Sequence, residues 1–209
     1  MDVLGDETKV VATGYGRIAV DFCRLCDHGD HLPCKGRKRI GRGGDCTVID
    51  VGGQDTKVIL IENGMVQDFL MNDKCSAGTG KFLEIMANRL GVTLQELFDL
   101  AEKGTVLPIS SLCTVFAESE VINYIGEGRS REDIAAGVVD SVVTKVAQLA
   151  MRKAMTDRVI LTGGLSHSAY FTRRLSEQIG KNVESTADGR YAGALGAAIL
   201  AEEKSRRGR

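Results

Sequence analysis

The sequence predicts an α/β protein built on one sheet, and three observations carry that prediction. Apolar, β-branched runs recur between residues 47 and 71, and helical apolar periodicity follows from 79 to about 155. A further apolar run at 158–162 ends in Gly163-Gly164 before another helical segment. A meander of strands, followed by helices and by strands able to pair in parallel, favours an α/β or α+β architecture, and we take the α/β class.

The composition is that of an ordinary globular protein. The 209 residues are 43% hydrophobic and 26% charged, and the net charge of −1 gives no support for a nucleic-acid or membrane-surface role. Met1–Asp6 lacks the apolar region of a signal peptide, and no apolar run reaches membrane-spanning length. We therefore expect a cytoplasmic protein without nucleic-acid or membrane partners. Its six cysteines are expected to bind metal, catalyse or lie buried rather than form disulfides.

Strand-like segments come first along the chain. They are expected at residues 8–13, 47–51, 56–61 and 65–71, the last three forming an antiparallel meander. Gly52-Gly53 turns the chain between the first two strands of this meander, and Asn63-Gly64 is a strong hairpin signal before its third.

Four helices are predicted to follow the meander, because apolar residues recur on one face at helical spacing. They span residues 79–90, 93–103, 114–126 and 130 to about 155. Thr93 with Glu96 three residues later has capping-box spacing, and Ser130 opens the longest helix. The rest of the chain is predicted as strand 158–162, helix 167–179, a short strand at 182–185 and a last helix at 189–203.

Two glycine pairs each follow an apolar strand and indicate a phosphate or nucleotide site. In Asp50-Val51-Gly52-Gly53-Gln54, the glycines would let backbone N–H groups approach a phosphate, and Asp50 could hold Mg²⁺ through water. Gly163-Gly164 joins a buried strand to a helix, which is a frequent nucleotide-contact arrangement. Ordinary glycine turns are the structural alternative for both pairs.

Cys75 and Cys113 each close a polar loop before a helix-like run. The N–H groups and the dipole of a helix N-terminus favour thiolate, which is the form that holds iron–sulfur clusters. Two such residues are too few for a four-thiolate site, whereas two copies of the chain would supply four. Buried structural cysteines are the alternative.

These motifs, in this order, resemble a known family. The two strand-glycine motifs and the small-residue segment 193–198 look like the second half of the actin, sugar-kinase and heat-shock-protein ATPase fold, which is ribonuclease H-like. With the cysteine motifs added, the chain resembles the 2-hydroxyacyl-CoA dehydratase activators of the BadF/BadG/BcrA/BcrD ATPase family. The motifs that carry this narrower resemblance are Asp50–Lys57, Asn72–Phe82, Cys113–Val121 and Leu161–Gly164.

The resemblance implies a homodimer in which Cys75 and Cys113 of both subunits hold one bridging 4Fe–4S cluster. It also implies ATP or ADP with Mg²⁺ at Asp50, Gly52, Gly53, Gln54, Gly163 and Gly164. ATP would reshape the dimer, and a low-potential electron would pass to an acyl-CoA dehydratase or benzoyl-CoA reductase-type partner. Reduced ferredoxin or flavodoxin is the expected electron donor. The alternative is a kinase-like nucleotide-binding domain without a cluster.

The resemblance further implies a division of the chain. Residues 1–45 correspond to part of the first ATPase lobe, without its phosphate loop, and residues 46–209 to a complete second lobe. Because ATP in this fold is clamped between both lobes, the sequence predicts nucleotide binding but does not establish hydrolysis. We expect residues 46–203 to fold like the family's second lobe and residues 18–45 to pack loosely.

Segment 18–45 is atypical of the family. Its Cys23-x-x-Cys26-x-His28-x-x-His31-x-x-Cys34 pattern has zinc-ligand residues at short spacings, so a zinc-binding interaction module at 23–34 is a further alternative. A codon string for Cys26–Gly36 can instead be written whose next frame reads Val-Ile-Thr-Glu-Ile-Thr-Cys-His-Ala-Lys, which resembles the family's usual segment. We therefore hypothesise a compensated frameshift here.

Overall fold

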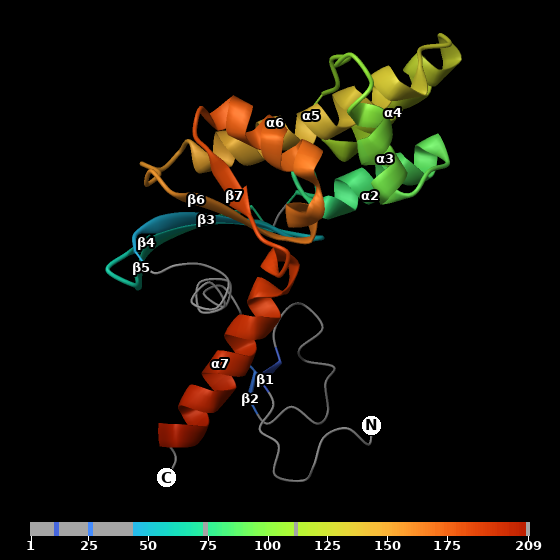
Figure 1. Cartoon of the computed structure of the whole chain (residues 1–209). Coiled ribbons are helices and arrows are strands. Elements are labelled where there is room, and N and C mark those ends of the chain that lie inside the picture. The colour runs from blue at the N-terminus through green and yellow to red at the C-terminus, as the bar shows by residue number, and fades with distance from the viewer. Residues whose placement is uncertain (1–10, 13–24, 27–43, 73–74, 111–112, 208–209) are drawn as a thin grey trace, which may run out of the picture.

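A computed structural model of the chain describes residues 11–12, 25–26, 44–72, 75–110 and 113–207. A five-stranded mixed sheet lies at its centre, in the order β5-β4-β3-β6-β7 (Figure 1). Its strands are β3 (Cys46–Val51), β4 (Thr56–Glu62), β5 (Met65–Asn72), β6 (Val159–Gly163) and β7 (Val183–Ser185). The α/β class is confirmed.

The sheet combines two pairing modes. β3, β4 and β5 form the predicted antiparallel meander, and β6 and β7 join β3 in parallel. Asn63 and Gly64 have φ values of 51° and 76°, which a two-residue hairpin of the primed type requires. The parallel pairing of β3 with β6 brings the ends of both strands, with their glycine pairs, to one edge of the sheet.

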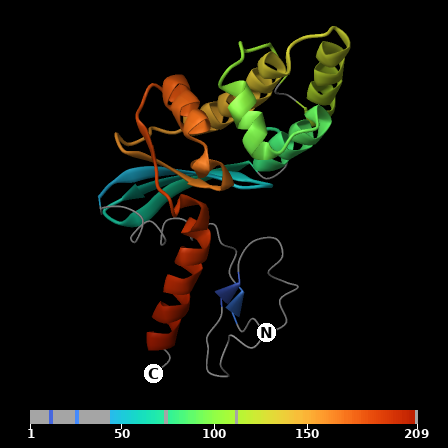
Figure 2. The same ribbon diagram turned by 45° about the vertical axis from the view of Figure 1, so that its right-hand side comes forward.

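Helices cover one face of the sheet, and Figure 1 shows α5 and α6 on that side. The elements are α2 (Gly80–Leu90), α3 (Leu94–Ala101), α4 (Thr114–Gly126), α5 (Arg131–Ala150) and α6 (Ala169–Ile179). The last helix, α7 (Ala192–Arg207), runs away from the sheet on the opposite side, as Figure 2 also shows.

Several helix boundaries agree with the sequence prediction. Thr93 and Glu96 make the full capping box at α3, and the Ser130 side chain accepts a hydrogen bond from the N–H of Asp133 at α5. However, α5 ends at Ala150 rather than near 155, because the chain turns back toward β6 and the N–H of Thr156 bonds Thr47 Oγ1 at 3.0 Å.

Two of the later helices also begin after their predicted starts. A 3-10 turn, η2 (Gly164–His167), precedes α6, and a second, η3 (Gly189–Tyr191), precedes α7. The Ser168 side chain caps α6 by accepting a hydrogen bond from the N–H of Phe171 at 3.1 Å. The predicted helices at 167–179 and 189–203 therefore each combine a 3-10 turn with an α-helix.

The main core lies between the sheet and the helices. It joins the inward residues of β3 and β6 to apolar faces of α2, α3, α5 and α6, with Phe82, Ile134, Leu161, Phe171 and Leu175 among its fully buried side chains. The strands alternate, so that Val48 belongs to a second, smaller cluster with Cys46, Ile59, Ile61 and Ile160. Both faces of β3 are therefore buried.

The N-terminal part is described only at two short strands. β1 (Val11–Ala12) and β2 (Leu25–Cys26) pair in parallel, and β1 contacts α7. The predicted strand 8–13 coincides with β1 at its described residues. Most of segment 18–45, including Cys23, His28, His31 and Cys34, lies outside the described residues. The predicted loose packing of that segment and the division of the chain at residue 45 stay predictions.

Candidate functional site

The turn between β3 and β4 is held from two sides. Within the turn, the N–H of Gly52 donates to the carbonyl of Asp55 at 2.9 Å. From outside, the first two N–H groups of α2 reach the turn: that of Gly80 donates to Gly52 at 2.9 Å, and that of Lys81 to Gly53 at 2.8 Å. The N-terminus of α2 is therefore fixed against the predicted phosphate-binding turn.

The second glycine pair lies beside the first. In the parallel register, Val51 of β3 pairs with Gly163 of β6. Gly163 has a φ of 85°, and a Cβ there would lie 2.3 Å from the carbonyl oxygen of Val51. Only glycine fits this close approach, so Gly163 allows β6 to pack directly against the end of β3, where the first glycine turn begins.

A pocket of about 600 Å³ opens in front of these two turns. Four residues predicted from the sequence line it: Gly52, Gly53, Gln54 and Gly164. The other two predicted residues, Asp50 and Gly163, do not line it; Gly163 instead packs against Val51. Residues of the two glycine motifs, which are far apart in sequence, are thus adjacent in the fold.

Sequence reasoning missed several lining residues. They are Lys81, Glu84, Leu94, Leu165 and Arg190. Lys81 and Leu165 directly follow glycines of the site or its neighbouring helix, which is a local signal that could have identified them. Leu94 and Arg190 come from α3 and η3, and nothing in their local sequence indicates the pocket.

Asp50 lies one residue before the end of β3. Its Oδ1 accepts a hydrogen bond from Thr162 Oγ1 at 2.6 Å, across the β3–β6 pair. Burial raises the pKa of the Asp50 carboxyl above its ordinary value, and the hydrogen bond from Thr162 and the charge of Lys57 oppose that rise only in part. A bound cation would remove the cost of ionising this group.

Lys57 lies opposite Asp50 in the β3–β4 register. It is 8% exposed, and its Nζ pairs with Asp55 Oδ2 at 2.7 Å. The charged groups behind the turn are thus arranged so that one buried cation faces two carboxylates.

Cys75 and Cys113 lie on two loops that touch each other. The residue after each cysteine carries a hydroxyl, and Ser76 Oγ and Thr114 Oγ1 are hydrogen-bonded at 2.8 Å. Cys75 is exposed and Cys113 is half-buried. The fold therefore brings together the two loops that carry these cysteines, which are 38 residues apart in sequence.

The two cysteines differ in their relation to the helices. Cys113 is the N-cap residue of α4, as its sequence position predicts. Cys75 is not at a helix N-terminus, because α2 is capped at Thr79 and starts at Gly80. The prediction was wrong in that respect, since Ser76–Thr79 forms a turn in which the N–H of Thr79 donates to the Ser76 carbonyl at 3.0 Å.

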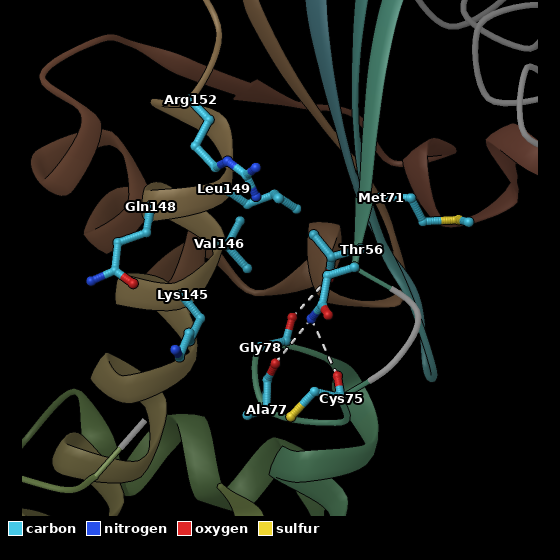
Figure 3. Close-up of a pocket in the computed structure, with 11 residues that line it drawn as sticks. Thr56, Met71, Cys75, Ala77, Gly78, Lys145, Val146, Gln148, Leu149 and Arg152 are labelled. Carbon is cyan, nitrogen blue, oxygen red and sulfur yellow. Dashed lines mark hydrogen bonds between the residues drawn. The ribbon is translucent and has the colours of Figure 1, made fainter. Parts of the chain in front are cut away.

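Side chains from two strands fix the loop after Cys75 (Figure 3). Asn72 Nδ2 donates to the carbonyls of Cys75 and Ala77, each at 3.2 Å. Thr56 Oγ1 donates to the carbonyl of Gly78 at 2.7 Å. Because Gly80 and Lys81 bond the glycine turn, one short segment, residues 75–81, connects the pocket to the cysteine pair.

Within the part of the chain that the structure describes, no three His, Cys, Asp or Glu side chains are grouped so as to hold a metal ion. The third described cysteine, Cys46, is buried in β3. The zinc-type residues of segment 23–34 lie outside the described residues, apart from the backbone of Cys26. No described helix is long and apolar enough to cross a membrane.

The sheet order, the covering helices and the paired glycine turns are those of the actin and sugar-kinase fold class. A xylulose kinase structure from Lactobacillus acidophilus, 12% identical, shares this fold over 86% of the chain and 41% of its own, with a TM-score of 0.56. Residues 5–201 match the model of the BadF/BadG/BcrA/BcrD ATPase family. The chain belongs to that family.

Relatives within this family carry more specific names. The (R)-2-hydroxyglutaryl-CoA dehydratase activating ATPase of Acidaminococcus fermentans is 47% identical over 76% of this chain. The match spans only 62% of that protein's length. The activator of lactoyl-CoA dehydratase of Anaerotignum propionicum is 40% identical, over 97% of this chain and 78% of that protein.

One solved structure similar to this chain has a nucleotide analogue bound. It is the activator of the 2-hydroxyisocaproyl-CoA dehydratase from Clostridium difficile, with bound ADPNP. It is 37% identical, covers 98% of this chain and 78% of its own, and has a TM-score of 0.90.

Proposed function

We propose that this chain is an ATP-dependent activator that supplies a low-potential electron to an acyl-CoA dehydratase or benzoyl-CoA reductase-type partner. The observation that carries the proposal is the hydrogen bond between Ser76 and Thr114, which joins the two cysteine loops. Names of relatives support the activator role, since several are called activators of acyl-CoA dehydratases and another is a component of benzoyl-CoA reductase.

The cysteine pair fits half of a four-thiolate site. Iron–sulfur clusters of the 4Fe–4S type take four thiolates, and each chain would supply two, from exposed Cys75 and half-buried Cys113 on adjoining loops. Cys113 at the N-cap of α4 would face the anionic cluster with the positive end of the helix dipole. Cys75 and Cys113 of two copies would hold the group, which when bound supplies one-electron chemistry.

The surface next to Cys113 supports self-association. Four apolar side chains of α4 are largely exposed: Val115 and Phe116 at 65% each, Ile122 at 53% and Ile125 at 46%. Because an apolar face of this kind is costly in water, we infer that it is covered when two copies share their cysteines. A homodimer is therefore part of the proposal.

The pocket at the glycine turns is the proposed nucleotide site. Backbone N–H groups of the turn would bind phosphate, and Asp50 would hold Mg²⁺ through water. Gly164, Leu165 and Arg190 line the part of the pocket formed by β6 and η3 and would approach the nucleoside. The nucleotide state would reach the cysteines through segment 75–81, which hydrogen bonds tie to the turn at Gly80 and Lys81.

Anaerobic purification tests the cluster and the activity together. We expect a brown protein with about two irons and two sulfides per chain, since one 4Fe–4S cluster is shared by two copies. In the reduced form with Mg-ATP, it should activate an acyl-CoA dehydratase of the type its relatives serve. Colourless protein with tight Mg-ADP binding would instead favour a kinase-like nucleotide-binding domain.

A calorimetric titration with Mg-ADP tests the pocket. Gly53→Val should abolish binding, because Gly53 lines the pocket, and should leave the fold intact, because a Cβ added there would have no neighbouring atom within 4 Å. Gly126→Val is the matched control, since Gly126 is equally open but lies at the end of α4. Gly163→Val is unsuitable, because it would clash with Val51.

A further inference from the structure

A second pocket, of about 340 Å³, opens beside Cys75. It lies between the Cys75 loop, the end of β5 and the C-terminal half of α5 (Figure 3). The wall formed by α5 and the residues just after it presents Lys145, Gln148, Leu149 and Arg152. It shares no lining residue with the nucleotide pocket, so the two are separate sites.

The polar groups at the floor of this pocket are already engaged. Thr56 is 1% exposed, and its hydroxyl is bonded to the Gly78 carbonyl. The Asn72 amide is bonded to Cys75 and Ala77. A ligand would therefore find few free hydrogen-bonding groups at the floor. The charged side chains at the rim would have to recognise it.

Those charges are two cations, Lys145 and Arg152. In the part of the chain that the structure describes, neither side chain has an ion-pair partner, whereas nearby Lys153 pairs with Asp68 and Arg174 with Asp140. The helix between Ser141 and Ala150 carries no acidic residue. Arg152 follows the C-terminus of α5, where a cation also favours the helix dipole, but that role does not account for Lys145.

We propose that this rim is the docking site for a carboxylate-rich surface of the electron-transfer protein that reduces the chain. The proposal rests on the proposed function, because it takes exposed Cys75 as a ligand of the redox group. Carboxylates of an acidic protein would pair with Lys145 and Arg152 and so bring its redox centre next to Cys75. A protein surface fits better than a small anion, since the cations lie at an open rim and Arg152 is exposed.

Titration of the anaerobically purified protein with a strongly acidic ferredoxin tests this directly, at low salt and at about 0.5 M salt. The charge-reversed variant Lys145→Glu/Arg152→Glu should bind about tenfold more weakly than wild type at low salt, since two exposed ion pairs are replaced by like-charge contacts. The difference should nearly vanish at high salt. Lys145→Gln/Arg152→Gln should be intermediate.

The matched control is Lys103→Glu/Arg129→Glu, which changes the net charge equally at two exposed cations outside this pocket. An equal loss of affinity in the control would show that the effect depends only on net charge, which would overturn the proposal. Unchanged binding by the charge-reversed variant would do the same. A change in its dimer dissociation would assign the rim to the second copy, and phosphate binding abolished by the reversal would assign it to small anions; either result overturns the proposal.

Iron content is measured in the same samples. Docking does not need the cluster to be loaded, so lost binding is read independently of iron. Absence of iron from the wild type would contradict the proposed function, whereas weak ferredoxin binding by an iron-loaded wild type would contradict the docking proposal alone.

Discussion

At the residue scale, Asp50 shows how function opposes stability. Its carboxyl is buried against Thr162 with a raised pKa, so the folded chain holds the proton of this group more tightly than the unfolded chain does. Such a group stabilises the fold at low pH. The contribution declines as pH rises above the unfolded pKa, near 3.8, toward the raised value of the folded state.

Asp50→Asn should therefore stabilise the nucleotide-free chain at neutral pH, because the amide keeps an acceptor for Thr162 and carries no charge. The gain should shrink as pH falls toward about 4, because the unfolded wild-type chain then begins to take up the proton that the folded chain already holds. Thermal unfolding between pH 4 and 8 measures it. Exposed Asp157→Asn should show no comparable gain, and an Asp50→Asn variant less stable than wild type throughout would contradict the argument. Mg-ADP binding should be lost.

Cys75 and Cys113 are the proposed cluster ligands, and single substitutions test them separately. Cys75→Ser and Cys113→Ser should each abolish bound iron, because removal of either leaves too few thiolates for a shared cluster. Buried Cys46→Ala should keep its iron, since Cys46 lies in β3. Iron and sulfide analysis after anaerobic purification gives the answer. Full iron retention in Cys75→Ser would remove that residue from the ligand set.

At the element scale, the loop before Cys113 is fixed by two helices. The N–H of Ser110 bonds Glu120, and Tyr124 Oη donates to the Pro108 carbonyl at 2.8 Å, so α4 holds the loop that precedes it. From the other side, a Cβ on Gly137 of α5 would lie 2.3 Å from the Leu107 carbonyl. The backbone of the loop thus packs directly against α5.

Gly137→Ala should destabilise the protein by about 1–3 kcal/mol, because the added methyl group would force the loop and α5 apart. Gly126→Ala is the matched change at the end of α4, where no atom lies within 4 Å of the added group. It should be neutral or stabilise by up to about 1 kcal/mol. Urea unfolding compares the two, and equal stability of both variants would show that the loop yields easily.

The elements also show what the sequence could predict. Strands and helix starts were predictable because their signals are local: alternation, the Asn63-Gly64 turn, and the caps at Thr93 and Ser130. The end of α5 was not, since it depends on a contact between Thr156 and Thr47, which are 109 residues apart. The loop position of Cys75 was predicted, but the turn Ser76–Thr79, which separates this residue from the N-terminus of α2, was not.

At the scale of the whole molecule, the site too combines features that local sequence signals predict with features that only long-range contacts create. The glycine turns were predictable from strand-Gly-Gly patterns, and the parallel register of β3 with β6 brings them together. Leu94 and Arg190 reach the pocket only through the packing of α3 and η3, so no local pattern could assign them. The junction of the cysteine loops by Ser76 and Thr114 is likewise a product of the tertiary fold.

The hydrogen bond between Ser76 and Thr114 completes a short connection from the glycine turn to the cysteine loops. The glycine turn accepts hydrogen bonds from Gly80 and Lys81 at one end of segment 75–81, and Ser76 bonds Thr114 at the other. A nucleotide that orders the turn should therefore also order the cysteine loops. Amide hydrogen exchange with and without Mg-ADP should show added protection at residues 75–81 and in the first turn of α4.

Ser76→Ala/Thr114→Ala should separate the two ends of this link. Mg-ADP affinity should stay within about twofold of wild type, because neither residue lines the nucleotide pocket. Protection by Mg-ADP should persist at Gly80 and Lys81 but disappear from the start of α4, since the hydroxyl pair that joins the loops is gone. If α4 stays as protected as in the wild type, the nucleotide state reaches Cys113 by another route, such as the ion pair between Arg89 of α2 and Glu118 of α4.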